Sequence, residues 1–272
     1  MGEALVAGLL ACKWSEPADL RVVEAIDARR AELAASFPGI EITDRPGAAD
    51  GTIVAVKPAA VAAAVGDVVA ADGGRILSIA AGVTLAALEA AAGDGLSVVR
   101  AMPNTPALVG SGAAAVAAGR WAGDDDLAWA VELLEAVGTV VVVPESLLDA
   151  VTGLAGSGPA YVFLVAEALV DAGVLVGLPR DVASSLAAQT LLGAARLLTG
   201  TDDGPEALRA AVTSPAGTTA AGLRVLEQRG VRAAFIDAVV AARDRSAELA
   251  APTSGGTGSA GRTVHAQRQQ QQ

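Results

Sequence analysis

The pattern of apolar and polar positions changes about halfway along the chain. In the first half, short apolar runs alternate with amphipathic stretches, which predicts parallel strands connected by helices. The predicted strands cover residues 20–23, 51–56, 75–79, 97–100 and 139–143, and the predicted helices cover residues 1–11, 27–36, 59–71 and 85–92. This alternation indicates an α/β domain with a doubly wound parallel sheet.

After Pro144 the chain shows helical periodicity alone. The predicted helices cover residues 160–172, 180–198, 205–211, 220–228 and 231–249. The stretch Tyr161 to Leu169 is apolar on nearly all sides, so it must be buried all round, either by a partner subunit or by the chain's own α/β domain. Residues 251–272 are rich in Gly, Ser, Thr and Gln, and we expect a disordered tail there.

Composition and charge narrow the classes of partner. The chain has 272 residues, is 53% hydrophobic and carries a formal charge of −11, which argues against nucleic acid or an anionic membrane as the main partner. The longest uncharged runs are broken by Pro and Gly, so we expect no membrane span, and we see no secretory signal. The single cysteine, Cys12, fits a reducing compartment. These features predict a cytoplasmic protein that acts on small molecules.

The chain has one histidine, His265, and it lies in the polar tail. This placement excludes a Ser-His-Asp triad and a histidine metal site, and we expect no metal. Any chemistry must therefore work without imidazole.

Ligands of an open parallel sheet bind beyond the carboxyl ends of its strands. Three runs lie at such ends: Val56-Lys57-Pro58, Ser78 to Gly82, and Arg100 to Pro106. The small residues of the second run would let a flat cofactor approach the backbone. Without further context Lys57 is better explained as a solvated residue at a strand end, and Asn104 either presents its amide or only forms a turn.

The run Val212 to Thr219 combines two pairs of hydroxyl residues with a proline and a glycine, just before a predicted helix. Free backbone N–H groups and hydroxyls at a helix start suit an anion such as a carboxylate. An ordinary capped helix start would give the same pattern.

Several motifs occur together in one order along residues 1–249. They are Met1 to Leu5, Ala55 to Pro58, Arg100 to Pro106, Asp149 to Gly153, Gly156 to Tyr161, Gly177 to Arg180, and Val212 to Thr219 continued by Gly222-Leu223 and Leu226-Glu227. In these motifs the chain resembles the pyrroline-5-carboxylate reductase family. The last motif is the most specific to that family.

The resemblance implies hydride transfer from NADPH or NADH to the C=N carbon of 1-pyrroline-5-carboxylate, which gives L-proline. It implies that Thr219 is catalytic through a hydrogen bond to the ring nitrogen. By the same resemblance, the substrate-binding residues are Glu145, Ser214, Gly217, Thr218 and Thr219, and the cofactor-binding residues are Gly2, Glu24, Arg45, Val56, Lys57, Pro58, Ala81 and Asn104.

The resemblance also implies a domain organisation and a partner. We expect a Rossmann-like dinucleotide-binding domain at residues 1–145 and an all-α dimerisation and substrate domain at residues 146–250. In the family the substrate loop of one subunit lies near its partner, which implies a homodimer or a higher homo-oligomer. Such a partner would also cover the apolar helices.

Three departures from the family pattern stand out. The family begins with a strand and a Gly-x-Gly-x-x-Gly turn, and Gly2 aligns with the third glycine alone, so we expect the first strand and two glycines to be missing from this sequence. A chain without them is expected to bind the cofactor weakly and to fold poorly. Ala155 stands where Ser is usual. Ala216 stands where Gly is usual, and its methyl group is tolerable only if its φ is negative.

The cofactor preference stays open in the sequence. Glu24 follows the second family strand, where an acid favours the free ribose hydroxyl of NADH, whereas Arg45 could contact the phosphate of NADPH. Two other functions also stay open. A hydroxyacid or prephenate dehydrogenase would need a basic or histidine residue that we do not find. A non-catalytic helical dimer could have lost cofactor binding together with the first strand.

Overall fold

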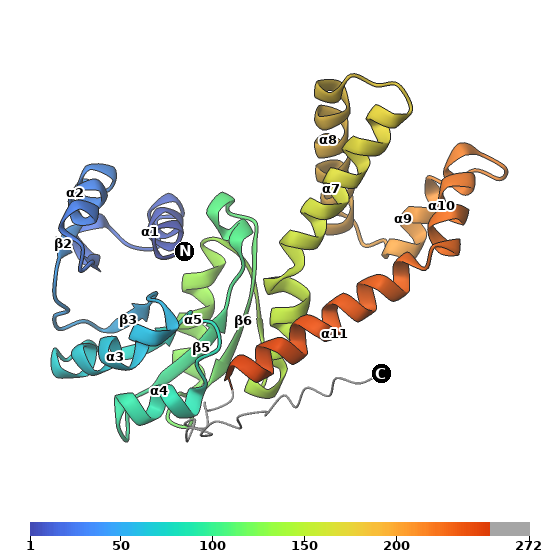
Figure 1. The fold of residues 1–272 in the computed structure, drawn as a ribbon. Coiled ribbons are helices and arrows are strands. Elements are labelled where there is room, and N and C mark those ends of the chain that lie inside the picture. The colour runs from blue at the N-terminus through green and yellow to red at the C-terminus, as the bar shows by residue number, and fades with distance from the viewer. Residues whose placement is uncertain (251–272) are drawn as a thin grey trace, which may run out of the picture.

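The computed structural model describes residues 1–250, and the predicted tail at residues 251–272 lies outside them (Figure 1). The first part of the chain alternates helices and strands. Its elements are α1 (Gly2–Ala11), β1 (Arg21–Val23), α2 (Asp27–Ser36), β2 (Glu41–Thr43), β3 (Gly51–Val54), α3 (Val61–Ala70), β4 (Arg75–Ser78), α4 (Leu85–Ala92), β5 (Val98–Met102), β6 (Gly112–Ala118), α5 (Asp124–Glu135) and β7 (Gly138–Val142).

Every described element after β7 is helical. These elements are α6 (Leu148–Val151), a π-helical segment η5 (Thr152–Gly156), α7 (Gly158–Leu175), α8 (Arg180–Gly200), α9 (Pro205–Ala211), α10 (Thr218–Gln228) and α11 (Val231–Ala250). Short 3-10 turns connect several of them, including η3 (Thr105–Val109) and η4 (Glu145–Leu147). The predicted change from an α/β region to an all-helical region is confirmed.

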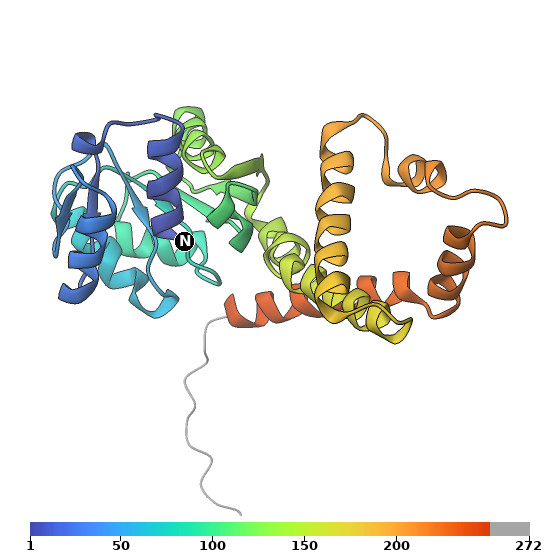
Figure 2. The same ribbon diagram turned by 90° about the horizontal axis from the view of Figure 1, so that it is seen from above.

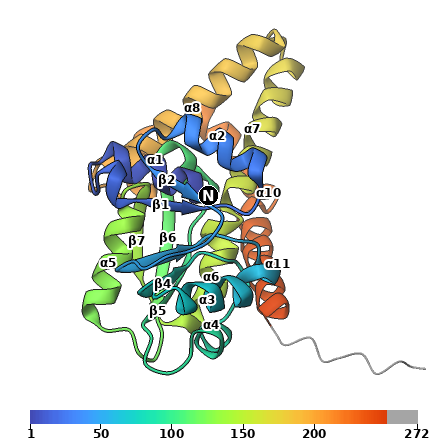
Figure 3. The ribbon, with the colours of Figure 1, turned by 90° about the vertical axis from the view of Figure 1, so that its left-hand side faces the viewer.

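The strands form two separate sheets. β1 pairs in parallel with β2, and a second sheet has the order β3-β4-β5-β6-β7. Figure 3 shows β1, β2 and α2 on one side of β3 and α3. In a doubly wound sheet of order 3-2-1-4-5-6, the first strand lies between the strands that correspond here to β1 and β3. The break in pairing therefore falls where the resemblance places the family's first strand.

Two hydrophobic clusters cover the two faces of the larger sheet. One cluster joins β3, β4, β5 and β6 to α3, α4 and α6, with Val65, Ile76, Leu88 and Leu148 fully buried. The other joins the opposite face to α1 and α5 through residues such as Leu5 and Leu134. Alternate side chains of a strand point to opposite faces, so both faces of these central strands are apolar.

The predicted sheet is confirmed with one departure in direction. β6 runs antiparallel to β5, with Ala101 opposite Val116, while the other neighbours in the sheet are parallel. The apolar and polar pattern predicts no element at β2, β6 or α5. β6 has the sequence Gly-Ala-Ala-Ala-Val-Ala-Ala, and a run of alanines carries little strand preference.

The helical part extends away from the sheet domain. Figures 1 and 2 show α7 and α8 as a long hairpin and α11 running back towards the sheet. Its apolar side chains are largely exposed within one chain, including Phe163, Leu164 and Leu175 at 63%, 66% and 87%. Helix α7 has no fully buried residue. A second subunit that covers this surface would satisfy the all-round apolar pattern of α7.

Candidate functional site

The carboxyl ends of β3, β4 and β5 form one edge of the sheet, and the start of α1 lies beside it. A Cβ placed on Gly2 would approach the Cβ of Ala55 to 3.3 Å, just beyond the end of β3. The first N–H bonded within the helix is that of Leu5, which donates to the carbonyl oxygen of Met1 at 3.1 Å. The N–H groups of residues 2–4 are therefore unused by the helix, and they can serve an anion.

Small residues lie along this edge where the sequence analysis expected them. Ala81 is exposed at the end of β4, and Gly82 adopts a φ of +75° with open space around the position of a Cβ. Val56, Lys57 and Pro58 follow β3 on the same edge and are exposed. The edge therefore carries small and apolar residues, with the cation of Lys57 beside them.

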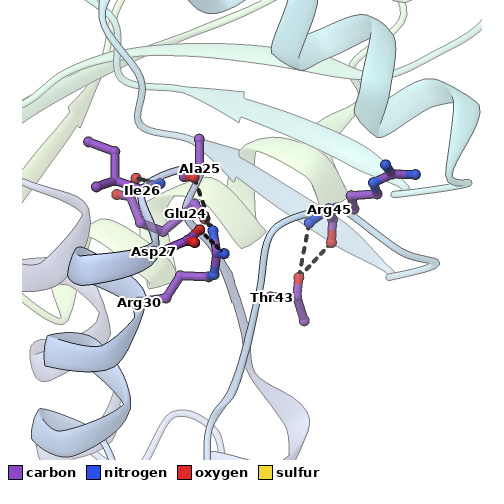
Figure 4. A network of polar contacts seen from close by, with 7 residues as sticks. All are labelled: Glu24, Ala25, Ile26, Asp27, Arg30, Thr43 and Arg45. Carbon is purple, nitrogen blue, oxygen red and sulfur yellow. Dashed lines mark hydrogen bonds and ion pairs between the residues drawn. The ribbon is translucent and has the colours of Figure 1, made fainter.

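Glu24 and Arg45 lie at the ends of the two strands of the smaller sheet (Figure 4). Glu24 Oε1 accepts a hydrogen bond from the N–H of Ile26 at 3.0 Å, and Arg45 is held through its backbone by the hydroxyl of Thr43. The Arg45 guanidinium forms no ion pair with any residue in 1–250.

Sequence reasoning did not single out Arg30, which lies beside Glu24. Its guanidinium donates to the carbonyl oxygens of Glu24 and Ala25 at 2.7 and 3.0 Å and pairs with Asp27. Arg30 thus fixes the turn that carries Glu24. The only hint in the sequence was that Arg30 lies six residues after Glu24, in the first turn of α2, close enough to contact the turn at Glu24.

Asn104 differs from the expectation that its amide is presented outward. The side chain is buried, its Nδ2 donates to the carbonyl oxygen of Ala155 at 3.0 Å, and its Oδ1 accepts from the N–H of Ala113 at 2.9 Å. The amide is therefore occupied by structural bonds. The second N–H and the second lone pair of the amide form no hydrogen bond within residues 1–250.

Glu145 lies just after β7, in the turn that leads into the helical part. Its Oε1 accepts one hydrogen bond from Arg100 Nη1 at 2.7 Å and one from the N–H of Leu85 at 2.6 Å. Leu85 is the first residue of α4, so the carboxylate lies at a helix N-terminus, where negative charge is favoured. Sequence reasoning assigned no role to Arg100, although an arginine within an apolar strand was visible.

The run Val212 to Thr219 forms the loop before α10, which we call the substrate loop. Gly217 is the N-cap residue of α10, and its N–H donates to the carbonyl oxygen of Ser214 at 3.0 Å. A Cβ at position 217 would lie 2.3 Å from Ser214 Oγ, so a side chain there would clash with Ser214. The first N–H bonded within α10 is that of Ala221, which leaves the amides of residues 218–220 for a ligand.

The structure bears on two residues of this loop. Ala216 has a φ of +60°, so the condition of a negative φ is not met, and the methyl group is held in the left-handed region. The N–H of Gly217 is already engaged by Ser214, so the available donors are those of Thr218, Thr219 and Ala220. Thr218 and Thr219 are both exposed.

The structure does not bring the substrate loop of one chain to the sheet edge of the same chain. Figures 1 and 2 show α9 and α10 at the end of the molecule farthest from the sheet domain, and α10 packs on α11. Thr219 and Ser214 are thus separated from Glu145 and from the residues at the ends of β3 and β4.

The residues of the sheet edge fit a dinucleotide. A helix N-terminus with unused N–H groups suits a pyrophosphate, and the small residues at Ala81 and Gly82 leave space for a flat ring. The acid and the arginine at the ends of β1 and β2 suit a ribose or its phosphate.

Comparisons with known proteins point the same way. Residues 145–249 match the family model described as pyrroline-5-carboxylate reductase dimerisation. Pyrroline-5-carboxylate reductase of Corynebacterium melassecola is 44% identical over 257 residues, which are 92% of this chain and 95% of that protein. The solved structure of the Coxiella burnetii enzyme has a TM-score of 0.88 at 34% identity and covers 92% of this chain and 95% of its own.

A second solved structure adds the cofactor of a relative. Pyrroline carboxylate reductase of Plasmodium falciparum, solved with NADP bound, has a TM-score of 0.77 at 26% identity and covers 92% of this chain and 95% of its own. Within residues 1–250, the run Glu145–Leu175 is long and apolar enough to cross a membrane, judged by length and composition alone. This run lies within the matched dimerisation region, which indicates a homo-oligomer.

The fold, the sheet edge and these similarities agree with one another. The chain therefore belongs to the pyrroline-5-carboxylate reductase family, and it catalyses the NAD(P)H-dependent reduction of 1-pyrroline-5-carboxylate to L-proline in proline biosynthesis.

Proposed function

We propose that each active site is assembled from two subunits of a homodimer, which can assemble further into rings. One subunit supplies the sheet edge with Glu145, and its partner supplies the substrate loop. This arrangement is supported by the separation of the two regions within one chain and by the exposed apolar surface of α7 (Figure 2). The separation of loop and edge is the observation that carries the proposal.

The sheet edge would hold the cofactor in this proposal. The amides at Gly2 would bind the pyrophosphate, Glu24 and Arg45 would bind the ribose at the adenine end, and Val56, Lys57, Pro58, Ala81 and Asn104 would line the rest. Bound NADPH or NADH would supply the hydride for the C=N carbon, and the ring nitrogen takes up a proton, so that the imine becomes the amine of L-proline. The free guanidinium of Arg45 favours NADPH, while the carboxylate of Glu24 favours NADH.

The substrate loop holds the other reactant. The amides of Thr218 and Thr219 at the start of α10 bind the carboxylate, and Ser214 supports the loop from within. Gly217 allows the close turn that aims these amides. The Thr219 hydroxyl bonds the ring nitrogen, and Glu145 lies near the ring. Orientation of the two reactants then carries most of the rate enhancement, which agrees with a site that lacks histidine.

We also propose the boundaries of the two domains and the cellular location. Residues 1–145 form the dinucleotide-binding domain, and residues 146–250 form the dimerisation and substrate domain, in line with the end of β7 at Val142 and the family match over residues 145–249. A cytoplasmic location agrees with the single, exposed and unpaired Cys12.

Complementation between two impaired variants tests the shared site. Thr219→Ala should weaken transition-state binding by about 1–3 kcal/mol, because a hydrogen bond to the ring nitrogen is lost. Glu145→Gln should impair the sheet edge. Coexpression of the two variants gives mixed dimers in which one site has an intact edge and an intact loop. The turnover of the mixture should recover to about a quarter of the wild-type value.

The control is a mixture of Thr219→Ala with itself, prepared under two different affinity tags and purified in the same way. A mixture of the two variants that stays at the level of this control would show that loop and edge come from one chain. Wild-type kcat and KM in Thr219→Ala alone would remove the role of Thr219.

A further inference from the structure

Arg100 is a charged side chain in the middle of an apolar strand. It lies on β5 between Val99 and Ala101, which are 1% exposed, and its own side chain is 7% exposed. A buried guanidinium is costly unless it is paired and hydrogen-bonded. The residue that pairs with Arg100 therefore indicates the role of this buried charge.

That partner is Glu145, whose side chain is 33% exposed. Arg100 Nη1 and the N–H of Leu85 both donate to the same carboxylate oxygen, Oε1, at 2.7 and 2.6 Å. The two donors come from β5 and from the start of α4, so they fix the carboxylate from two independent elements. The second oxygen, Oε2, accepts no hydrogen bond from the part of the chain that the structure describes.

We propose that Arg100 is a positioning residue for the reduction, which holds Glu145 so that its second oxygen is presented to the substrate ring. This inference rests on the proposed role of Glu145 at the substrate. A glutamate side chain loses considerable rotamer freedom when it is held in one place, and a pre-set carboxylate avoids that loss at the moment of binding. Arg100 is nearly inaccessible, so it acts through Glu145 and does not itself contact the substrate.

A double-mutant cycle on the full-length chain separates this role from simple support of the fold. The variants are Arg100→Gln, Arg100→Lys, Glu145→Gln and the pair Arg100→Gln with Glu145→Gln. For each variant, kcat and KM for pyrroline-5-carboxylate are measured together with the midpoint of thermal unfolding. Arg180→Gln is the matched control, because it removes the exposed ion pair with Asp171 at 2.9 Å in the helical part.

We expect Arg100→Gln to lower kcat/KM by about 10- to 100-fold, as a misplaced catalytic group does. The loss should vanish in the Glu145→Gln background, and Arg100→Lys should restore part of the activity because it keeps the charge. Arg180→Gln should keep wild-type kcat/KM.

Two results would overturn the inference while leaving the proposed function in place. The first is that Arg100→Gln keeps wild-type kcat/KM although Glu145→Gln lowers it. The second is that Arg100→Gln lowers kcat/KM by the same factor in the wild-type and in the Glu145→Gln background. Wild-type kcat/KM in Glu145→Gln is a different outcome, because it would remove Glu145 from the proposed site. If Arg100→Gln does not fold, Arg100→Lys completes the cycle with the same expected signs.

Discussion

At the scale of single residues, Ala216 shows how strain can sit at a binding loop. Its φ of +60° places an alanine where the backbone favours glycine. Ala216→Gly should raise the free energy of unfolding by about 0.5–1 kcal/mol, because relief of the left-handed strain exceeds the extra entropy that glycine gains in the unfolded chain. Urea unfolding of the full chain measures the change.

The control for this prediction is the same substitution five residues later. Ala221 lies inside α10, where Ala221→Gly should lower the free energy of unfolding by about 0.5–1 kcal/mol. A loss of stability in both variants would mean that Ala216 is not strained.

The residues differ in how far their roles follow from sequence. Motif spacing placed Ala81 and Lys57 at the sheet edge and Thr219 at a helix start, because local patterns fix where strands end and helices begin. The partner of a polar side chain does not follow from local pattern. The inward position of the Asn104 side chain and the pairing of Arg100 with Glu145 could not be predicted, because these contacts join segments that are distant in the sequence.

At the scale of elements, Asn104 joins three segments that the sequence separates. Its side chain connects the end of β5 to the N–H of Ala113 in β6 and to Ala155 in η5. Asn104→Ala should lower the free energy of unfolding by about 1–3 kcal/mol, because the buried N–H and carbonyl groups lose their partners.

Asn104→Asp isolates one of the two bonds. It keeps the acceptor for Ala113 and removes the donor to Ala155, which is the link to the helical part. Denaturant titration of both variants compares the two bonds. Equal stability of Asn104→Ala and the wild type would show that water replaces the side chain without cost.

The helices of the second half were predicted closely, and some strands were not. Strong apolar periodicity and proline or glycine boundaries gave α9 at Pro205–Ala211 and α11 from Val231, as predicted. β2 has three residues and β6 is mostly alanine, so neither leaves a clear strand signal. Their place in the sheet depends on long-range pairing.

At the scale of the whole molecule, the distance between loop and edge could not be read from the sequence. It depends on how α7, α8 and α11 leave the sheet domain, and no local pattern encodes these directions (Figure 1). The apolar surface of α7 did predict that something must cover it. The apolar pattern therefore required a covering surface, and the family resemblance implied that a partner subunit supplies it, but neither gave the geometry of the contact.

The break between the two sheets predicts parts of unequal stability. β1 and β2 have three residues each and pair only with one another within residues 1–250, while β4 is buried between β3 and β5. Amide hydrogens of Val22 and Glu24 should therefore exchange with deuterium much faster than those of Ile76 and Leu77, as hydrogen-exchange mass spectrometry can measure. Equal protection of the two regions would contradict this.

Independent opening of the small sheet would also affect cofactor binding. In the proposed site Glu24 and Arg45 both lie at the ends of these strands, so binding of the adenine end of NADPH or NADH would restrain the small sheet. The loss of conformational entropy would then lower the binding affinity. The preference between the two cofactors would depend in part on how strongly each one restrains β1 and β2.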